Sequence, residues 1–489
     1  MMSVMRAWLA GIAAFGAVIV LGAGAVVVWL DSGMAYEIAP RIPGTDRPAG
    51  ASGQDVPEKL EGKLTTFDVK APEVRGNWPC FRGKTREGIS DDLTPLARTW
   101  PKDGPPVKWS LQVGEGHAGA AILDGRVYLH DYDAGQRQEV IRCLGLDSGK
   151  DIWRYAYRLR IKRNHGSTRT VPAVTDKYLL ALGAKCHVTC LEPTTGKLLW
   201  AKDLVAEYGT TIPQWYAAQC PLIDDGNAIL APCGQVIESQ DSAGKTVYRG
   251  KDVLMTAVRC DTGKVTWEVP NPDGWKMTHS SIAVMEMEDY TRMYVYCGSG
   301  GVVGVSAKDG KVLWKTTDWK ISIATVPTPV SLGQGKLFFT GGYGAGSVML
   351  QVVKEGDHYA GKVLFRLSPA VFASEQQTPV FFKNHIFGTR VDEQFACMSA
   401  GGQVVWTSGQ DNKFGKEGGP YLLADDMLLV MDGEGVLRML KATPQSYQEV
   451  ARAKVLPGPH SWGPMALAGG MLICRDLHNM VCLDVKKKD

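Results

Sequence analysis

The sequence predicts an all-β fold: an eight-bladed β-propeller of four-stranded blades, preceded by one transmembrane helix and a flexible linker. Three observations predict the propeller. A motif that ends in an aromatic residue recurs at similar intervals, eight pairs of apolar runs are each interrupted by a tight turn, and 56 of the 489 residues are glycine. Evenly spaced short strands with periodic glycine and aromatic motifs are typical of propellers.

The recurring motif is a β-prone run, then Asp, Ser or Thr, then Gly-Lys, two residues and an aromatic residue, as in LDSGKDIW and PTTGKLLW. Its aromatic residues are spaced 47, 67, 47, 51 and 41 residues apart: Trp153, Trp200, Trp267, Trp314, Phe365 and Trp406. One propeller blade takes about 40–50 residues. The long interval therefore contains an insertion, which we place in the polar stretch 237–251 and expect to be a loop.

The chemistry of the motif is packing between blades. We expect the glycine to make a tight turn with positive φ and each aromatic ring to wedge between neighbouring blades. A small residue stands seven positions before the lysine in four copies: Cys143, Cys190, Ala257 and Gly304. A small residue repeated at one place indicates a crowded position on a strand.

The eight apolar hairpins begin with AAILDGRVYLH and end with GPMALAGGMLIC. The last is followed by a single further strand before the sequence ends, so the final blade is one strand short. The strand around Trp109, which also carries a docking tryptophan, precedes the first hairpin and has no blade of its own. We expect it to close the eighth blade of a domain spanning 100–489, so that no sheet edge is left open.

The N-terminal segments are predicted to anchor and tether this domain. Residues 1–30 are a membrane anchor or uncleaved signal, because the uncharged run 7–30 would span roughly 36 Å as a helix and so cross a hydrocarbon core of about 30 Å. Arg6 precedes this run and acidic residues follow it, which places the rest of the chain outside the cytoplasm. A cleaved signal peptide stays open as the alternative. Residues 31–72 are rich in proline and glycine and predict a flexible linker, and residues 73–99 form a pre-propeller arm.

The repeat tails with Asp/Thr-Gly-Lys-x-x-Trp resemble the tryptophan-docking repeats of the PQQ-like (pyrroloquinoline-quinone-like) β-propeller superfamily, also called quinoprotein alcohol dehydrogenase-like. The segment WPCFRGKTREGIS, from Trp78 to Ser90, is similar to the WPxFRG segment of exported bacterial members. The resemblance covers about Trp78 to Val485. It implies the fold but leaves the activity open, because the superfamily contains quinone-dependent dehydrogenases and also cofactor-free scaffolds such as the propeller lipoprotein of outer-membrane barrel assembly.

The features expected of a quinoprotein alcohol dehydrogenase are weak in this sequence. The resemblance would imply two adjacent cysteines that form a disulfide ring over the quinone, but none of the eleven cysteines is adjacent to another. The haem-attachment pattern Cys-x-x-Cys-His is also absent. We therefore assign no residues to a cofactor, and binding of PQQ with calcium stays open as the alternative.

The residues just before each innermost strand converge on a propeller's axis. They form a candidate axial ligand ring: His117, Arg169, Trp215, Gln219, His279, Glu375, Gln377, Glu417, His460 and Trp462. Histidine and carboxylate side chains are metal ligands by type, but no spacing supports a metal site, and none is predicted. The ring would hold a polar ligand or only water. Its tryptophans would either pack at the rim or stack on a planar ligand.

The cysteines are mostly explained by burial. Two of the four small positions are cysteines, and Cys397 and Cys482 occupy nearly the same place in their own blades. Because an exported compartment permits disulfides, we name Cys220 and Cys233, expected on neighbouring strands, as the most plausible pair.

These features together predict a membrane-anchored, single-pass protein whose C-terminal propeller lies on the periplasmic or extracytoplasmic side. We expect a non-catalytic binding or scaffold module that takes a cell-envelope protein or a small ligand at the propeller top. The alternatives are a PQQ-dependent dehydrogenase of alcohols or sugars, and a scaffold that recruits partners by donated strands at blade edges. With 54 basic and 51 acidic residues and no large basic block, nucleic-acid binding is disfavoured.

Overall fold

The computed structural model describes residues 22, 24, 60–69, 72–240, 246–415 and 418–488. The chain divides into two units, 1–52 and 53–489. The first unit contributes only Gly22 and Gly24, both helical. The predicted anchor and most of the predicted linker therefore lie outside the described residues. Within the described part, no helix has the length and apolar character that a membrane crossing requires.

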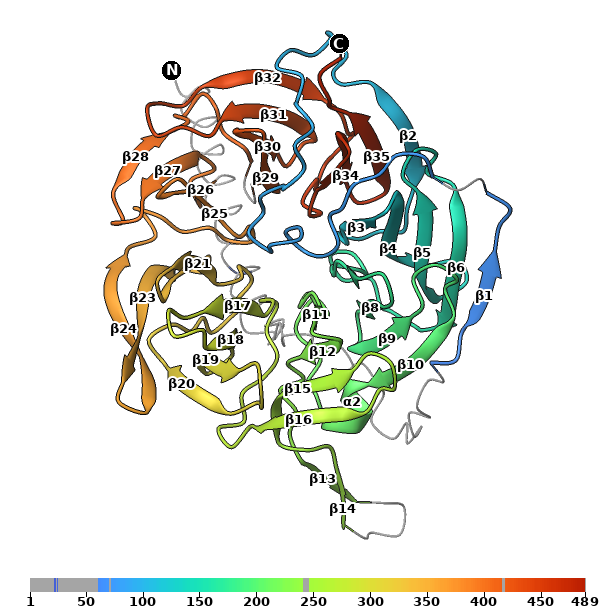
Figure 1. Cartoon of the computed structure of the whole chain (residues 1–489), viewed down its shortest axis with the longest axis vertical. Coiled ribbons are helices and arrows are strands. Elements are labelled where there is room, and N and C mark those ends of the chain that lie inside the picture. Colours follow the sequence, from blue (N-terminus) through green and yellow to red (C-terminus); the bar gives the residue numbers. More distant parts are fainter. Residues whose placement is uncertain are drawn as a thin grey trace, which may run out of the picture. The chain divides into compact units, whose positions relative to one another are not determined.

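Eight sheets surround a central axis in the second unit, which confirms the predicted eight-bladed propeller (Figure 1). Blade 1 contains β3 (Ala120–Leu123), β4 (Arg126–Asp133), β5 (Gln138–Gly145) and β6 (Asp151–Arg158). Blade 2 contains β7 (Ala173–Val174), β8 (Leu179–Leu182), β9 (His187–Leu191) and β10 (Leu198–Asp203). Blade 3 contains β11 (Leu222–Asp224), β12 (Asn227–Leu230), β15 (Val253–Arg259) and β16 (Val265–Pro270). Blade 4 contains β17 (Ala283–Glu286), β18 (Arg292–Gly298), β19 (Gly301–Ser306) and β20 (Val312–Thr316).

The remaining four blades repeat this order. Blade 5 contains β21 (Val330–Gly333), β22 (Lys336–Gly341), β23 (Gly346–Glu355) and β24 (His358–Leu367). Blade 6 contains β25 (Val380–Phe382), β26 (His385–Thr389), β27 (Phe395–Ser399) and β28 (Val404–Thr407). Blade 7 contains β29 (Tyr421–Ala424), β30 (Met427–Met431), β31 (Val436–Lys441) and β32 (Glu449–Lys454). Blade 8 contains β33 (Ala466–Ala468), β34 (Met471–Arg475), β35 (Asn479–Asp484) and β2 (Val107–Gln112).

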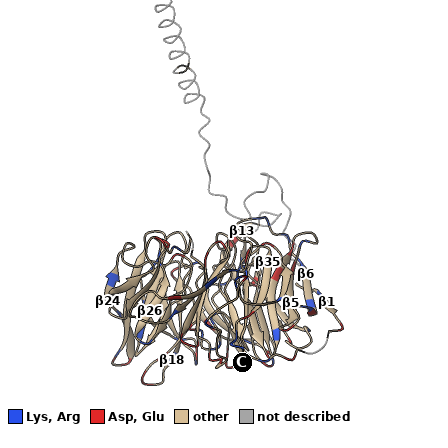
Figure 2. Cartoon of the chain, turned by 90° about the horizontal axis from the view of Figure 1, so that it is seen from above, with Lys and Arg blue, Asp and Glu red and all other residues tan. Residues whose placement is uncertain are grey.

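The first strand of each blade lies nearest the axis, where neighbouring blades contact each other through strands such as β33, β3 and β7. Figure 2 shows the blades edge-on, with basic and acidic residues interspersed. The ring closes as predicted, because β2 pairs antiparallel with β35 and sets Trp109 opposite Cys482. The first propeller strand is thus held by the last one.

The repeated aromatic residues dock on the next blade around the ring. Trp153 is buried, and its indole N–H donates to the carbonyl of Pro193 at 3.0 Å. A Cβ added to Gly196 in the same turn would lie 2.5 Å from this indole. The same arrangement joins Trp109 to the turn of Gly149. Glycine is needed in these turns both for its positive φ and because the ring lies on its Cα.

The small repeat position lies directly across the strand pair from each docking residue. Trp153 faces Cys143, Trp200 faces Cys190, Trp267 faces Ala257, Trp314 faces Gly304 and Trp406 faces Cys397. In blade 5, Met349 occupies this position and faces the smaller ring of Phe365. The predicted crowding is therefore confirmed, and it is set by the width of the indole.

Two segments differ from the prediction. The stretch 237–251 was expected to be a loop, but its described part forms a separate hairpin of β13 (Ile237–Gln240) and β14 (Thr246–Arg249). The linker expected over 31–72 contains β1 (Lys63–Thr66), which pairs with β6 as a fifth strand of blade 1. Leu64 of β1 reaches Gly196 beside Trp153. Packing against the first docking site therefore orders this part of the linker. A single short helix is described in this unit, α2 (Leu204–Tyr208), capped by Asp203 and Gly209.

The pre-propeller arm crosses the central channel. Trp78 pairs with Ile122 of blade 1 through two backbone hydrogen bonds of 2.8 Å. Further along, Arg86 donates to the carbonyl of Ile223 in blade 3, and Ser90 donates to that of Leu423 in blade 7. Blades 3 and 7 are four positions apart in a ring of eight, so the arm spans the bore from side to side (Figure 1).

The predicted disulfide between Cys220 and Cys233 is wrong, because all eleven cysteines are free and buried. The two thiols have different partners. The Sγ of Cys220 accepts the backbone N–H of Val171 at 3.3 Å, whereas the Sγ of Cys233 donates to the carbonyl of Leu254. The prediction rested on the expectation that the two cysteines lie on neighbouring strands, which does not fix the direction of their side chains.

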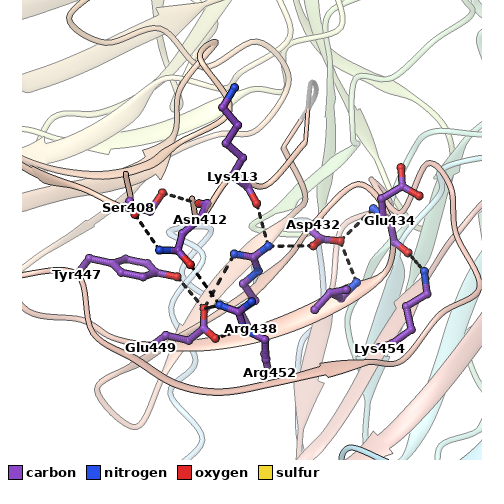
Figure 3. A network of polar contacts seen from close by, with 11 residues as sticks. Ser408, Asn412, Lys413, Asp432, Glu434, Arg438, Tyr447, Glu449, Arg452 and Lys454 are labelled. Carbon is purple, nitrogen blue, oxygen red and sulfur yellow. Dashed lines mark hydrogen bonds and ion pairs between the residues drawn. The ribbon is translucent and has the colours of Figure 1, made fainter. Parts of the chain in front are cut away.

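Polar networks also join neighbouring parts of the propeller. At the seam between blades 6 and 7, Arg438 donates to the carbonyl of Lys413 at 2.8 Å and to Asp432 at 3.3 Å (Figure 3). Its guanidinium also lies over the ring of Phe414, 4.3 Å from the centroid. Arg452 and Tyr447 both bind Glu449 on the same side. The loop after β28 is thereby fixed to β31 and β32.

A second network is buried between blades 1 and 2. The Glu139 carboxylate is fully buried and accepts the backbone N–H of Ala184 at 2.7 Å and the hydroxyl of Tyr157. His130 Nε2 lies 3.5 Å from the carboxylate. Burial alone would raise the pKa of Glu139, but its contacts with His130, His187 and Tyr157 outweigh burial and lower the pKa to about 2. The carboxylate is therefore ionised at neutral pH.

The docking turns can be tested by Gly196→Ala with Gly226→Ala as a matched control. Both glycines have positive φ, but an added Cβ at Gly226 meets nothing within 4 Å. We expect the control to lose about 1 kcal/mol of unfolding free energy through backbone strain. Gly196→Ala should lose about 1–3 kcal/mol more through overlap with Trp153. Denaturant unfolding of both variants measures the difference, and equal losses would contradict the docking role.

Glu139→Gln should make the free energy of unfolding less dependent on pH in the acidic range. A carboxylate whose pKa falls from 4.5 to about 2 on folding contributes stability above pH 4.5, and this contribution is lost as the pH falls toward 2. We expect the substitution to cost about 3 kcal/mol at pH 7 and progressively less below pH 4.5. Unfolding curves at several pH values test this, and a cost that does not change with pH would show that the ionised form is not stabilising.

Candidate functional site

A cavity of about 270 Å³ opens on the axis, at the end where the residues preceding the innermost strands converge. Its wall combines residues from loops of at least six blades with one residue of the pre-propeller arm. It brings together seven members of the predicted ring: His117, Arg169, Trp215, His279, Glu375, Gln377 and Trp462. These residues are far apart in sequence, and the closed ring of blades is what assembles them.

Two members of the predicted ring lie elsewhere, and a third cannot be placed. Gln219 is buried behind the wall, where its side-chain amide exchanges hydrogen bonds with the backbone of Ala231. His460 is not part of the lining and packs edge-on against Trp462, with ring centroids 4.6 Å apart. Glu417 lies outside the described residues.

Other lining residues were missed by the sequence analysis. Tyr343 lies in the glycine-rich turn between β22 and β23 and has φ of 56°. An aromatic residue inside a run of glycines was the available signal. His165 and Gln376 also line the cavity beside predicted members. Phe81 reaches it from the WPCFRG segment of the arm.

The arm forms the floor of the cavity. Phe81 lines both this cavity and a smaller one of about 70 Å³ between the arm and the innermost strands. Next to it, the buried guanidinium of Arg82 donates to the carbonyls of Thr378 at 2.6 Å and Pro379 at 2.8 Å, just before β25. It also donates to the carbonyls of Glu87 and Arg86 within the arm. Arg82 thus clamps the turn that presents Phe81 to the axis.

Aromatic rings occupy much of the wall. Trp462 stacks on His117, with ring centroids 5.0 Å apart and an interplanar angle of 14°. Trp215 leans on His279, with centroids 6.1 Å apart. Trp215 has φ of 64°, an unusual backbone conformation for a bulky residue. Both tryptophans are therefore held by histidine rings of the same cavity.

Three titratable groups of the wall have shifted pKa values. Burial, and then the charges of Arg169 and Arg475, lower the pKa of His117 to about 3. Burial and Arg169 lower the pKa of His279 to about 4. Burial raises the pKa of the Cys220 thiol to about 12. At neutral pH the two histidines are uncharged and the thiol is protonated, so none of the three is poised for proton transfer.

A family model described as outer membrane protein assembly factor BamB matches residues 136–408, more than half of the chain. The chain belongs to the BamB family. The matched residues run from blade 1 to the end of blade 6 and so include most of the cavity wall. No curated protein matches the sequence of this family member.

Three solved structures are similar to this BamB-family chain, and the first of them shows the same fold. The crystal structure of BamB from Moraxella catarrhalis has a TM-score of 0.52 at 13% identity, covering 78% of this chain and 99% of that one. A quinohemoprotein alcohol dehydrogenase from Comamonas testosteroni has a TM-score of 0.45 at 12% identity, covering 84% and 81%. A europium-containing methanol dehydrogenase has a TM-score of 0.44 at 12% identity, covering 83% and 90%. The two dehydrogenases are too dissimilar to bear on the activity of this chain.

The cavity of this BamB-family chain does not fit calcium-bound PQQ by its donor set. Ca²⁺ takes six to eight oxygen ligands, usually with several carboxylates. Glu375 is the one carboxylate among the described lining residues. The described part of the chain also contains no group of three or more His, Cys, Asp or Glu residues placed to hold a metal ion. No reaction step is therefore assigned to a quinone in this cavity.

Arg82→Met should release the arm from the channel. The substitution leaves the carbonyls of Thr378 and Pro379 without their donors, which we expect to cost about 2–4 kcal/mol of unfolding free energy. Lys84→Met is the control, because Lys84 lies in the same turn but its side chain is 63% exposed. Limited proteolysis near Trp78 should become faster only in the Arg82 variant. Equal protection in both variants would show that Arg82 does not hold the arm.

Proposed function

We propose that this chain is a non-catalytic binding or scaffold module of the cell envelope. In this proposal, residues 7–30 anchor it to the membrane, and the propeller stands on the periplasmic side with the axial cavity as its binding site for a cell-envelope protein or a small ligand. Membership of the BamB family supports the envelope location. The BamB structure from Moraxella catarrhalis shares the propeller fold.

The chemistry of the cavity wall carries the proposal. Proton transfer at neutral pH is favoured by a group whose pKa lies near that pH. The pKa values of His117 and His279 are lowered to about 3 and 4 and that of Cys220 is raised to about 12, so these three groups each keep one protonation state at neutral pH. Aromatic surfaces, neutral histidines and single charges are well suited to holding a ligand unchanged.

The alternative is a PQQ-dependent dehydrogenase of alcohols or sugars, and one experiment separates the two. The purified full-length chain is titrated with PQQ and Ca²⁺ and then assayed for dye-linked oxidation of alcohols and sugars. We expect no stoichiometric uptake and no turnover, because the described wall supplies one carboxylate, too few for the oxygen ligands that Ca²⁺ takes. Tight uptake with turnover would replace the binding module by the dehydrogenase.

A scaffold must also hold a companion. Cross-linking in the intact envelope, followed by purification of the chain, should recover a partner in a fixed ratio. Repeating the experiment with Arg82→Met tests whether the arm and the floor of the cavity take part in this contact. Recovery of the chain alone in every preparation would contradict the scaffold role.

A further inference from the structure

Two isolated charges face the axial cavity. The first is Arg169, which lies in the loop before β7 of blade 2. Its guanidinium donates to three backbone carbonyls of its own loop, those of Gly166 at 3.0 Å, Asn164 at 3.2 Å and His165 at 2.7 Å. These bonds fix the group in place but bring no negative charge to it, and no described carboxylate forms an ion pair with it.

The second charge is Glu375, which lies before β25 of blade 6. No described residue forms a hydrogen bond or an ion pair with its carboxylate. Its stem is held in position by Gly342, where an added Cβ would lie 2.5 Å from the Glu375 Cγ. Like Arg169, it is a positioned side chain whose charge has no partner within the protein.

The two charges lie on opposite sides of the axis. Blades 2 and 6 are four positions apart in a closed ring of eight, so the loops that precede them face each other across the cavity. The low pKa of both His117 and His279 is partly due to Arg169, which places the positive field on the side of blades 1 to 4. The cavity therefore has a positive side and a negative side.

Uncharged groups fill the wall between these two sides. Trp215, Tyr343 and Trp462 provide aromatic surface, and Gln377 provides an amide. His279 is 8% exposed, and its Nδ1 has no hydrogen-bond partner. Such a wall holds an apolar or planar group and can accept or donate single hydrogen bonds along it.

We propose that the axial cavity binds a zwitterionic amino-carboxylate ligand, an amino acid or very short peptide, with its carboxylate on Arg169, its ammonium on Glu375 and its side chain against the aromatic wall. The inference rests on the proposed function, because it names the ligand class of that binding module. A ligand with a single charge would leave one of these two charges without a partner. A neutral sugar would leave both unpaired.

Calorimetric titration of the full-length chain with the dipeptide Gly-Phe tests this assignment. The free dipeptide carries both charges, whereas N-acetyl-Gly-Phe lacks the ammonium and Gly-Phe amide lacks the carboxylate. We expect each blocked form to bind at least about tenfold more weakly than the free dipeptide, because each loses a charge-assisted contact. These comparisons leave the protein unchanged, so they do not depend on the folding of a variant.

Two substitutions assign the ends of the ligand. Arg169→Gln should weaken the free dipeptide about tenfold but leave the affinity for the amide unchanged. Glu375→Gln should do the same for the free dipeptide and leave the affinity for the N-acetyl form unchanged. Arg160→Gln is the control, because Arg160 is an exposed arginine near the start of the same loop and does not line the cavity.

Several outcomes would overturn the inference. Absence of binding by free Gly-Phe, or equal binding of the free and blocked forms, removes the zwitterionic ligand class. A loss caused by blocking only one end reduces the site to one for a simple anion or a simple cation. If a cross-linked envelope companion is still recovered in any of these cases, the ligand assignment fails while the proposed scaffold function stands.

Discussion

The whole structure depends on the contact between an aromatic ring on the outer strand of one blade and a glycine turn on the next. Trp109, Trp153 and Trp200 each lie on such a turn and donate the indole N–H to a carbonyl of the neighbouring blade. Each contact combines packing of the ring on the turn with a hydrogen bond from the indole N–H. Together these fix both the distance and the angle between the blades. Repetition of one angle is what closes a ring of sheets.

Ring closure in turn creates the site. The cavity is not formed by any single segment of the sequence. Most of its wall comes from loops spread between His117 and Trp462. Most of these loops precede an innermost strand, so the docking contacts at the outside of the blades decide how closely the loops meet at the axis. The burial that lowers the pKa of His117 is a consequence of this convergence. The docking contacts between blades therefore also influence the pKa values of the residues in the axial cavity.

The sequence predicts the blades well and the site incompletely. The reason is that the blades are signalled by local motifs, whereas the site depends on contacts between residues far apart in the sequence. Trp153 and its glycine turn are signalled by a local motif that repeats, so blade number and closure by Trp109 could be predicted. The strand of Leu64 could not, because it is ordered by a docking site on blades far along the chain. Tyr343 could not be assigned to the site, because the direction of a side chain in a loop depends on packing that no periodic pattern reports.

The pre-propeller arm links the cavity to the integrity of the ring. Arg82 holds blade 6, Arg86 holds blade 3, and Phe81 between the axis and these anchors forms the floor of the cavity. A ligand that contacts Phe81 therefore contacts the same segment that braces blades on opposite sides of the bore. Because coupling between two binding events is reciprocal, such a ligand stabilises the docked arm by the same free energy by which the docked arm favours the ligand. Ligand binding at the floor of the cavity and docking of the arm are therefore thermodynamically coupled.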